Sequence, residues 1–336
     1  NIVDDAINIR GLKRMAADYA GKVPPPECAP STGKRIAVVG GGPGGLSAAY
    51  YLQLMGHQTT VFEMLPKLGG MLRYGIPNYR LPKDRLDEDI QAILETGVQV
   101  EFGKRIGKDI TIQSLRQEYD AVLISIGAST DKKLGIEGEQ AEGVISAVSF
   151  LRDVGENKSP DLTGQEVAVI GGGNVSMDAV RTAKRLGAKK VSIVYRRRTA
   201  DMTALPAEIE GAVAEGIEVL TLKAPSRIET NENGHVSGIY VTPQMISKIK
   251  DGRASVCPTG EEDFLIPCQT LIVAIGQDIE SEHFAEAGVP VSRGKIMTER
   301  YGGFDNIPGV FAGGDCASGP ASVIKAIAAS KVVAAN

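Results

Sequence analysis

Two clusters of glycines stand out in the chain, because each follows a short apolar run and precedes a helical pattern. The first follows RIAVV and fits the spacing G-x-G-x-x-G with Gly40, Gly42 and Gly45, and it also contains Pro43 and Gly44. In such a turn the first glycine allows a sharp bend, the second lets the backbone approach a pyrophosphate, and the third lets the helix pack on the strand. The helix that starts here presents N–H groups and its positive dipole end to phosphates. The spacing therefore predicts a dinucleotide site.

An acidic residue supports this prediction. Glu63 ends the next apolar stretch, TTVF, at 63 − 40 = 23 residues after the first glycine. A carboxylate at the end of the second strand of such a unit binds ribose hydroxyls. A lone G-x-G-x-x-G is a weak signal, but a flanking strand, a helix and this acid make a glycine turn without a ligand the poorer interpretation.

The second cluster differs from the first at the matching strand end. Gly171 and Gly173 take the first two glycine positions, and Ser176 takes the third. The strand end, 196 − 171 = 25 residues on, reads VYRRR and has no acid. Arg196 and Arg197 match a phosphate by forked, charge-assisted hydrogen bonds and would suit a bare diol poorly. The pattern favours a 2′-phosphate, and hence NADP(H) over NAD(H). The alternative is solvated surface charge, which is our expectation for the third arginine, Arg198.

A third glycine turn lies near the end of the chain. FAGGDCASG places Gly314 and Asp315 after a predicted strand and before a predicted helix. A carboxylate there can accept a hydrogen bond from a flavin ribityl hydroxyl. A simple capped turn is the alternative.

The composition excludes several other classes of protein. The chain has 336 residues, a net charge of -4 and only 5% aromatics, which argues against nucleic-acid binding. No apolar run approaches the length of about 18–20 residues that a membrane helix needs, and the N-terminus has no secretory h-region. The cysteines form no C-x-x-C pair and the histidines are scattered, so we expect no metal site and a cytoplasmic location.

The order of apolar runs and helical patterns predicts an α/β fold with two Rossmann-like dinucleotide-binding domains, the second inserted in the first. Residues 1–34 are predicted to form a helix and a Pro-rich linker, residues 35–155 with 281–336 the first domain, and residues 156–280 the second. RIETNENGHVSGIYVTP predicts a strand pair inside the second domain. Because the chain lacks an initial Met and stops inside a helical pattern, we expect it to be a piece of a longer polypeptide.

Together these motifs resemble the two-dinucleotide-binding-domain flavoproteins (pyridine nucleotide-disulfide oxidoreductase-like), and among them the glutamate synthase small (β) subunit family. The large subunit of bifurcating ferredoxin:NADP oxidoreductase and the flavin-containing N-terminal half of dihydropyrimidine dehydrogenase are also similar. The matching stretches cover nearly the whole chain in family order. They are AINIRGLKRMAADYA, VVGGGPGGLSAAYYL, GGMLRYGIPNYRLPKD, GVISAVSFL, VIGGGNVSMDAVRTAKRLGA, VYRRR, AIGQ and AGGDCASGPASVIKAI.

The resemblance implies an FAD-dependent NAD(P)H oxidoreductase in which the first domain binds FAD and the second binds NADPH. For FAD it implies Gly40, Gly42, Pro43, Gly44, Gly45, Glu63, Gly70, Leu72, Arg80, Gly127, Gly314 and Asp315. For NADPH it implies Gly171, Gly173, Asn174, Val175, Ser176, Arg196, Arg197 and Gly276. Of these, Gly127 and Gly276 match the positions where the chain crosses between the domains. No side chain is assigned as acid, base or nucleophile, because hydride transfer is the chemistry of the cofactors.

The sequence departs from the family's pattern in two places. The family's N-terminal cysteine-rich domain, which carries two [4Fe–4S] clusters, usually ends just before IRGLKR and is not in this sequence. After the arginines the family tends to read Met-Pro-Ala, whereas this chain has Met202, Thr203 and Ala204. We therefore expect any iron–sulfur clusters in a missing N-terminal domain or in a partner.

Three functions compete at this stage. The first is an electron-input module that passes electrons from NADPH through FAD to iron–sulfur clusters and then to a glutamate synthase large subunit, a ferredoxin or another oxidoreductase. The second is a stand-alone NAD(P)H-dependent reductase of a small acceptor, and the third is a flavin-stabilised assembly protein without turnover. The lack of a paired cysteine motif disfavours a disulfide reductase such as thioredoxin reductase.

Overall fold

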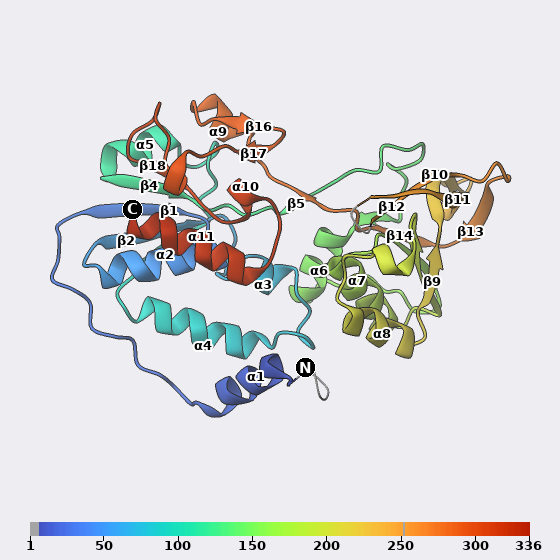
Figure 1. Ribbon diagram of the computed structural model, residues 1–336, viewed down its shortest axis with the longest axis horizontal. Coiled ribbons are helices and arrows are strands. Elements are labelled where there is room, and N and C mark those ends of the chain that lie inside the picture. The colour runs from blue at the N-terminus through green and yellow to red at the C-terminus, as the bar shows by residue number, and fades with distance from the viewer. Residues whose placement is uncertain (1–6, 251–252) are drawn as a thin grey trace.

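The structure is a computed structural model that describes residues 7–250 and 253–336. It has two halves, each built around a five-stranded parallel sheet (Figure 1). The first sheet, in the order β18-β4-β1-β2-β3, contains β1 (Arg35–Val39), β2 (Gln58–Glu63), β3 (Gln99–Phe102), β4 (Ala121–Ile124) and β18 (Val310–Ala312). The second, in the order β6-β14-β7-β8-β9, contains β6 (Val144–Ser146), β7 (Glu166–Ile170), β8 (Lys190–Tyr195), β9 (Glu218–Thr221) and β14 (Thr270–Val273). The predicted pair of Rossmann-like units is confirmed.

Both faces of the first sheet are buried, as the unbroken apolar run in β1 predicts. Ile36 and Val38 face one core, and Ala37 and Val39 face the opposite one. The helices that cover the first of these cores are α2 (Pro43–Leu54), α4 (Lys83–Leu94) and α11 (Val323–Ala335).

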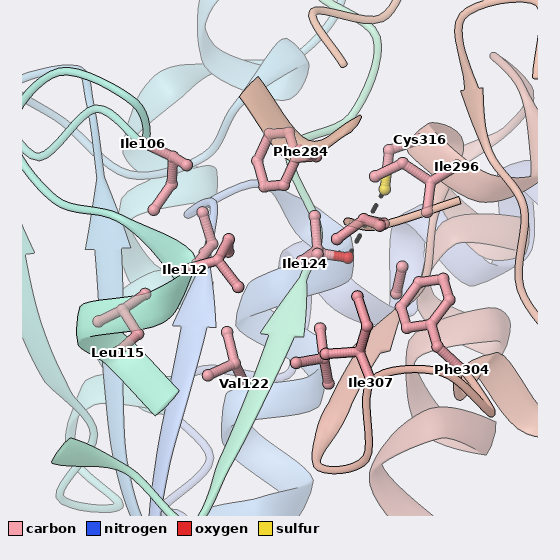
Figure 2. Close-up of a cluster of buried hydrophobic side chains, with 14 of the residues drawn as sticks. Ile106, Ile112, Leu115, Val122, Ile124, Phe284, Ile296, Phe304, Ile307 and Cys316 are labelled. Atoms are coloured by element: carbon pink, nitrogen blue, oxygen red, sulfur yellow. Dashed lines mark hydrogen bonds between the residues drawn. The ribbon is translucent and has the colours of Figure 1, made fainter. Parts of the chain in front are cut away.

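The opposite core joins two distant segments of the chain. Figure 2 shows Val122 and Ile124 of β4 next to side chains contributed by the C-terminal segment, including Phe284 and Ile307. The helix α5 (Ile112–Glu118) closes the other side of this core. The C-terminal segment is therefore part of the first domain, which confirms that the second domain is an insertion.

The second sheet is covered differently on its two faces. Three helices cover one face: α6 (Ala147–Gly155), α7 (Asn174–Arg185) and α8 (Pro206–Ala214). Antiparallel strands cover the other: β10 (Lys223–Thr230), β11 (Val236–Lys250) and β13 (Phe264–Pro267). A further strand, β12 (Arg253–Pro258), pairs with the end of β11. The predicted strand pair is β10 and β11, with Ile228 opposite Ile239.

The two chain crossings between the domains are paired with each other. β5 (Thr130–Asp131) runs antiparallel to β15 (Gln277–Asp278); β5 begins three residues after Gly127, and β15 follows Gly276 directly. The N–H of Lys132 also donates to the carbonyl oxygen of Gly276 at 3.3 Å. The halves are thus connected by two chain segments that pair as short antiparallel strands.

The second sheet takes its edge strand from a segment that we expected in the first domain. The sequence predicts one helical pattern over VISAVSFLRDVG, but β6 pairs with β14 and α6 begins only at Ala147. The strand ends at Ser146 because its hydroxyl caps the helix and accepts the N–H of Ser149 at 3.0 Å. We therefore propose that the second domain extends from Thr130 to Gln277, earlier than the expected start at residue 156.

The remaining elements are short or lie apart from the sheets. They are α1 (Ile9–Tyr19), α3 (Met71–Tyr74), η1 (Thr199–Asp201), α9 (Glu282–Glu286), β16 (Val291–Ser292), β17 (Lys295–Ile296), η2 (Arg300–Gly302) and α10 (Asp315–Ser318). The helix predicted near the N-terminus is present as α1, and residues 1–6 of that segment lie outside the described residues. Among the described residues, none of the helices has the length and apolarity to cross a membrane.

Candidate functional site

A cavity of about 560 Å³ opens at the carboxyl ends of the strands of the first sheet. Parallel α/β sheets bind their ligands at this edge. The predicted FAD residues in its lining are Gly40, Gly42, Pro43, Gly44, Glu63, Gly70, Gly127, Gly314 and Asp315. Val148 and Arg152 of α6 also line it, so the cavity reaches the border between the two domains.

Two close approaches of the backbone shape the first glycine turn. A Cβ atom on Gly45 would lie 1.9 Å from the carbonyl oxygen of Gly40. A Cβ atom on Gly70 would lie 2.7 Å from the Cα atom of Gly42. Glycine at position 45 lets α2 pack on β1, and the Gly42–Gly70 contact leaves backbone without side chains on which a diphosphate can lie.

Glu63 is held in place by the backbone of the same turn. Its Oε2 atom accepts the N–H of Gly41 and its Oε1 atom accepts the N–H of Leu65, both at 2.8 Å. The residue is only 6% exposed, and burial raises the pKa of its carboxyl although these backbone donors oppose the rise. Each oxygen keeps a second lone pair, so the side chain can still accept hydroxyl groups.

Asp315 has a hydrogen-bonding capacity that the protein does not fill. Its Oδ1 atom is buried and has no donor among the described residues. Burial raises the pKa of this carboxyl, and the N–H of Ala321 opposes the rise. A buried acceptor without a donor is costly, so it points to a group that the protein itself does not supply.

Three predicted FAD residues lie outside the cavity lining, and Gly45, in the tight turn described above, is one of them. Leu72 packs against the core under α2 and α4. Arg80 reaches the second domain, where its Nη1 atom lies 2.6 Å from both carboxylate oxygens of Asp178 in α7 and its Nε atom lies 3.4 Å from Glu208 in α8. Burial raises the pKa of Asp178 to about 6, against the opposing effect of Arg80. The sequence did not indicate this ion pair between the domains.

The second glycine turn repeats the first with one substitution. Gly171 has a φ of 144°, and a Cβ atom there would lie 2.3 Å from the carbonyl oxygen of Ala274. Ser176 takes the third position, where it is fully buried and its hydroxyl donates to the same carbonyl at 3.4 Å. Gly173 is the N-cap of α7, and Val175 packs against the helical core.

The three arginines after β8 have three different environments. Arg196 is exposed, and the Nε atom of Arg197 is buried without an acceptor among the described residues. Arg198 does not simply face water, because its Nε and Nη2 atoms donate to the carboxylate of Asp201 at 2.8 and 2.9 Å. Among the described residues, Arg198 is thus the one of the three arginines that is paired with a carboxylate.

The loop after the arginines folds back onto the second glycine turn. The N–H groups of Thr203 and Ala204 donate to the carbonyl oxygen of Gly172 at 3.0 and 3.1 Å. The N–H of Leu205 donates to the Oδ1 atom of Asn174 at 3.0 Å. The segment that departs from the family's Met-Pro-Ala pattern is thus fastened to the turn.

The cavity also contains residues that the sequence analysis missed. Ser125 follows β4, Met71 and Tyr74 belong to α3, and Lys104 follows β3. Ser125 could have been found from the strand-to-glycine pattern LISIG. Arg152 could not have been predicted, because no sequence motif near it indicates that α6 faces the first domain.

The cysteines are separate from one another in the described residues, which include all four, and none forms a disulfide. Burial raises the pKa of Cys268 to about 12 and that of Cys316 to about 11. The Sγ atom of Cys316 donates to the carbonyl oxygen of Ile124, as Figure 2 shows. The two buried thiols therefore behave as packing residues.

In the part of the chain that the structure describes, no group of three or more metal-ligating side chains comes together.

The fold and the two glycine turns define a protein of the two-dinucleotide-binding-domain class. A family model described as pyridine nucleotide-disulphide oxidoreductase matches residues 34–330, so the chain belongs to that oxidoreductase family.

Its relatives narrow the position within the family. The chain is 38% identical to the beta subunit of NADP(+)-dependent formate dehydrogenase from Moorella thermoacetica, over 97% of this chain and 50% of that protein. It is 36% identical to the beta subunit of NADPH-Fe(3+) oxidoreductase from Geobacter sulfurreducens, over 97% and 53%. It is 32% identical to the glutamate synthase [NADPH] small chain of Escherichia coli, over 98% and 74%. The resemblance to the glutamate synthase small-subunit family is confirmed, although the chain spans only about half the length of the first two relatives.

Solved structures agree on the fold. The FprA protein of Mycobacterium tuberculosis in complex with NADPH superposes with a TM-score of 0.76 at 21% identity, over 91% of this chain and 84% of FprA. Thioredoxin reductase from Lactococcus lactis superposes with a TM-score of 0.67 at 19% identity, over 90% and 97%. At these identities the likeness concerns the fold alone.

Proposed function

We propose that this chain takes electrons from NADPH, through FAD held in the first domain, and delivers them to a partner subunit or domain. One observation carries the proposal: the two sites have unfilled hydrogen-bonding groups of opposite kind. Asp315 presents a buried acceptor in the first, and Arg197 presents a buried donor in the second. A ribityl chain offers hydroxyl donors and a 2′-phosphate offers acceptors, so each site lacks what its proposed ligand supplies.

The residues of the first site fit FAD. The backbone at Gly42 and Gly70 would face the diphosphate, Glu63 the adenosine ribose and Asp315 the ribityl chain. When bound, FAD supplies the redox chemistry, because it can accept a hydride from a nicotinamide and pass electrons on singly. This chain's own contribution is to bind, to orient and to exclude water. Leu72 and Arg80 do not line the cavity, and we still propose that they contribute to FAD binding indirectly.

The second site is proposed to hold NADPH. The turn from Gly171 to Gly173 and the N-terminus of α7 would face its diphosphate, and Arg196 and Arg197 its 2′-phosphate. The names of the Moorella, Geobacter and Escherichia relatives each specify NADP(+) or NADPH, which supports the same choice here.

The electron acceptor is proposed to lie outside this sequence. Three relatives are named as beta subunits or a small chain, which supports a partner that receives the electrons. We propose iron–sulfur clusters in another domain or subunit as the immediate acceptor, followed by a glutamate synthase large subunit or a ferredoxin-like protein. The free thiols of the chain fit a reducing cytoplasm.

An anaerobic absorbance experiment tests the proposal. The purified protein should be yellow, and NADPH should bleach its flavin band at least tenfold faster than an equal concentration of NADH. A colourless protein that also fails to bind added FAD would overturn the flavin assignment. Equal bleaching rates with the two nucleotides would overturn the assignment of the second site to NADPH.

A further inference from the structure

The ion pair Arg198–Asp201 lies between the two halves of the proposed NADPH site and has no role in the function proposed so far. The side chain of Asp201 is 0% exposed. Its carboxylate accepts the backbone N–H of Arg198 at 3.2 Å, the Nε and Nη2 atoms of Arg198 at 2.8 and 2.9 Å, and the N–H of Ala254 at 3.0 Å. The hydroxyl of Tyr195 donates to the carbonyl oxygen of Asp201 at 2.8 Å. Asp201 is thus the centre of a network and not a surface acid.

The fourth donor comes from a distant segment of the chain. Ala254 is the second residue of β12, which pairs with residues 244–250 of β11. β10 accompanies β11 only as far as Pro243, so this two-stranded ribbon projects beyond the rest of the antiparallel sheet in the described residues. Ala254 is 2% exposed, and its N–H points to Asp201. The bond therefore fastens the ribbon to the end of β8.

The same network continues to the second glycine turn. From Asp201 the chain runs to Thr203 and Ala204, whose N–H groups bind the carbonyl oxygen of Gly172. Hydrogen bonds and a short stretch of backbone thus link the strand end that bears Arg196 and Arg197 with the turn that would face the diphosphate.

We infer that Arg198 and Asp201 are positioning residues for NADPH, and that they set the placement of Arg196, Arg197 and the loop 199–205 without touching the nucleotide. The inference rests on the proposed function. Asp201 occupies the Nε–Nη2 edge of Arg198, so a phosphate cannot take that edge while the ion pair holds and could reach only the Nη1 side. The pair and the ribbon should therefore act on nucleotide affinity as one unit.

A double-mutant cycle tests the inference. The variants are Arg198→Gln, Asp201→Asn and the double variant, and the probe is NADP+ titrated into the oxidised protein by calorimetry. Each single variant should weaken NADP+ binding about tenfold, and the double variant should be no weaker than either single one, because residues that act as a unit are not additive. With an artificial dye as acceptor, the KM for NADPH should rise by the same factor while kcat changes less than twofold.

If Arg198 instead contacts the phosphate directly, substitution of Asp201 should not weaken NADP+ binding. Asp201→Asn would then free the guanidinium and leave NADP+ binding unchanged or tighter, while Arg198→Gln weakens it. That outcome would overturn the inference, and so would normal NADP+ binding by both single variants. Arg198→Lys, which keeps the charge but loses the fork, should lie between the wild type and Arg198→Gln.

The ribbon provides a variant that leaves both charged residues in place. Ala254→Pro removes the N–H that binds Asp201, and because this N–H is not used in the strand pairing, proline is tolerated there. It should weaken NADP+ binding about threefold, whereas the matched control Ala254→Gly keeps the donor and binds normally. Equal binding by the two variants would overturn the role of the ribbon.

Two controls separate this inference from the proposed function. Flavin content and thermal unfolding of every variant show whether it has folded, and if Asp201→Asn loses its flavin, Arg198→Lys and Ala254→Pro carry the test. A wild-type protein that does not prefer NADPH over NADH contradicts the proposed function. A wild type that prefers NADPH, with variants that bind NADP+ normally, contradicts only the positioning role.

Discussion

The two strand–turn–helix–strand units of this chain share a backbone plan and differ in what they leave unfilled. The first unit (β1, α2 and β2) ends in Glu63, and the cavity beside it contains the Oδ1 atom of Asp315, an acceptor without a donor among the described residues. The second unit (β7, α7 and β8) is followed by arginines, and the Nε atom of Arg197 is a donor without an acceptor among the described residues. The same backbone arrangement thus carries acidic acceptors in one site and basic donors in the other. The difference indicates that the residues at the strand ends determine which ligand binds, because a side chain there can change without disturbing the strand pairing.

The helices after the two turns differ in a second way. The second turn accommodates Ser176, whose hydroxyl donates to the carbonyl oxygen of Ala274, at the position where a Cβ atom in the first turn would lie 1.9 Å from the carbonyl oxygen of Gly40. Two residues further on, α7 carries Asp178, whose counterpart in α2 is Ser47. Asp178 faces Arg80 of the other domain, whereas α2 packs against α11 of its own. The second unit therefore uses its helix to contact the first domain.

The largest effect should come from the third small residue of the first turn. Gly45→Val places a branched side chain where even a Cβ atom would lie 1.9 Å from the carbonyl oxygen of Gly40. We expect a loss of about 4–5 kcal/mol in the free energy of unfolding, together with loss of bound flavin. Urea unfolding and the flavin-to-protein absorbance ratio measure both. A yellow protein of normal stability would show that the first turn is no tighter than the second.

The next effect concerns the strand end that distinguishes the units. Arg196→Gln combined with Arg197→Gln removes two phosphate contacts, each worth about 1.5–3 kcal/mol. The kcat/KM for NADPH should fall at least hundredfold, while that for NADH changes less than about threefold. Steady-state dye reduction with both nucleotides gives the comparison. Equal losses for NADPH and NADH would mean that the arginines support the fold and not the 2′-phosphate.

The third effect is a pH dependence that belongs to the second unit. The pKa of Asp178 is raised by burial to about 6, above its value in the unfolded chain. Its contribution to stability is therefore greatest below about pH 4, falls as the pH rises to about 6, and is constant above that; the full change is about 3 kcal/mol. Asp178→Asn should lack this slope in urea unfolding between pH 4 and 7. The exposed acid variant Asp84→Asn is the control and should keep it. An unchanged slope in Asp178→Asn would refute this account of the ion pair.

The fourth effect has opposite signs with and without the cofactor. Asp315→Ala removes a buried carboxylate whose Oδ1 atom has no donor. The protein stripped of flavin should gain about 1 kcal/mol in stability, while FAD should dissociate more readily, because its proposed hydrogen-bond acceptor is lost. Thermal unfolding with and without added FAD separates the two. Loss of stability in both forms would mean that the carboxylate supports the fold itself.

The smallest effect is expected at the third position of the second turn. Ser176→Ala removes only a hydrogen bond of 3.4 Å to the carbonyl oxygen of Ala274 and keeps the Cβ atom that the turn already accommodates. The change in the free energy of unfolding should stay below about 1 kcal/mol. Urea unfolding measures it, and a loss as large as that of Gly45→Val would remove the distinction between the turns.

The features that were predictable from the sequence are those set by residues close together in the chain. The glycine turns, Glu63 and the strand pair of β10 and β11 follow from local spacing, and the structure places them as expected. β6 was missed because a strand of three residues directly before a helix is too short to show an alternating apolar pattern. The pairs Arg80–Asp178 and Asp201–Ala254 join residues 98 and 53 positions apart, and neither partner alone signals the other. Such contacts depend on how domains and ribbons pack, which no local pattern encodes.

The edge strands of the two sheets determine when each domain can be completed during synthesis. The second sheet takes its edge from β6 and is complete once β14, ending at Val273, has been made. The first sheet starts with β1 but must wait for β18, and its cavity must wait for Asp315. Domains fold as units as the chain emerges. The inserted domain can therefore fold on the ribosome before its host, and uptake of the proposed flavin would follow only after Asp315 has been made.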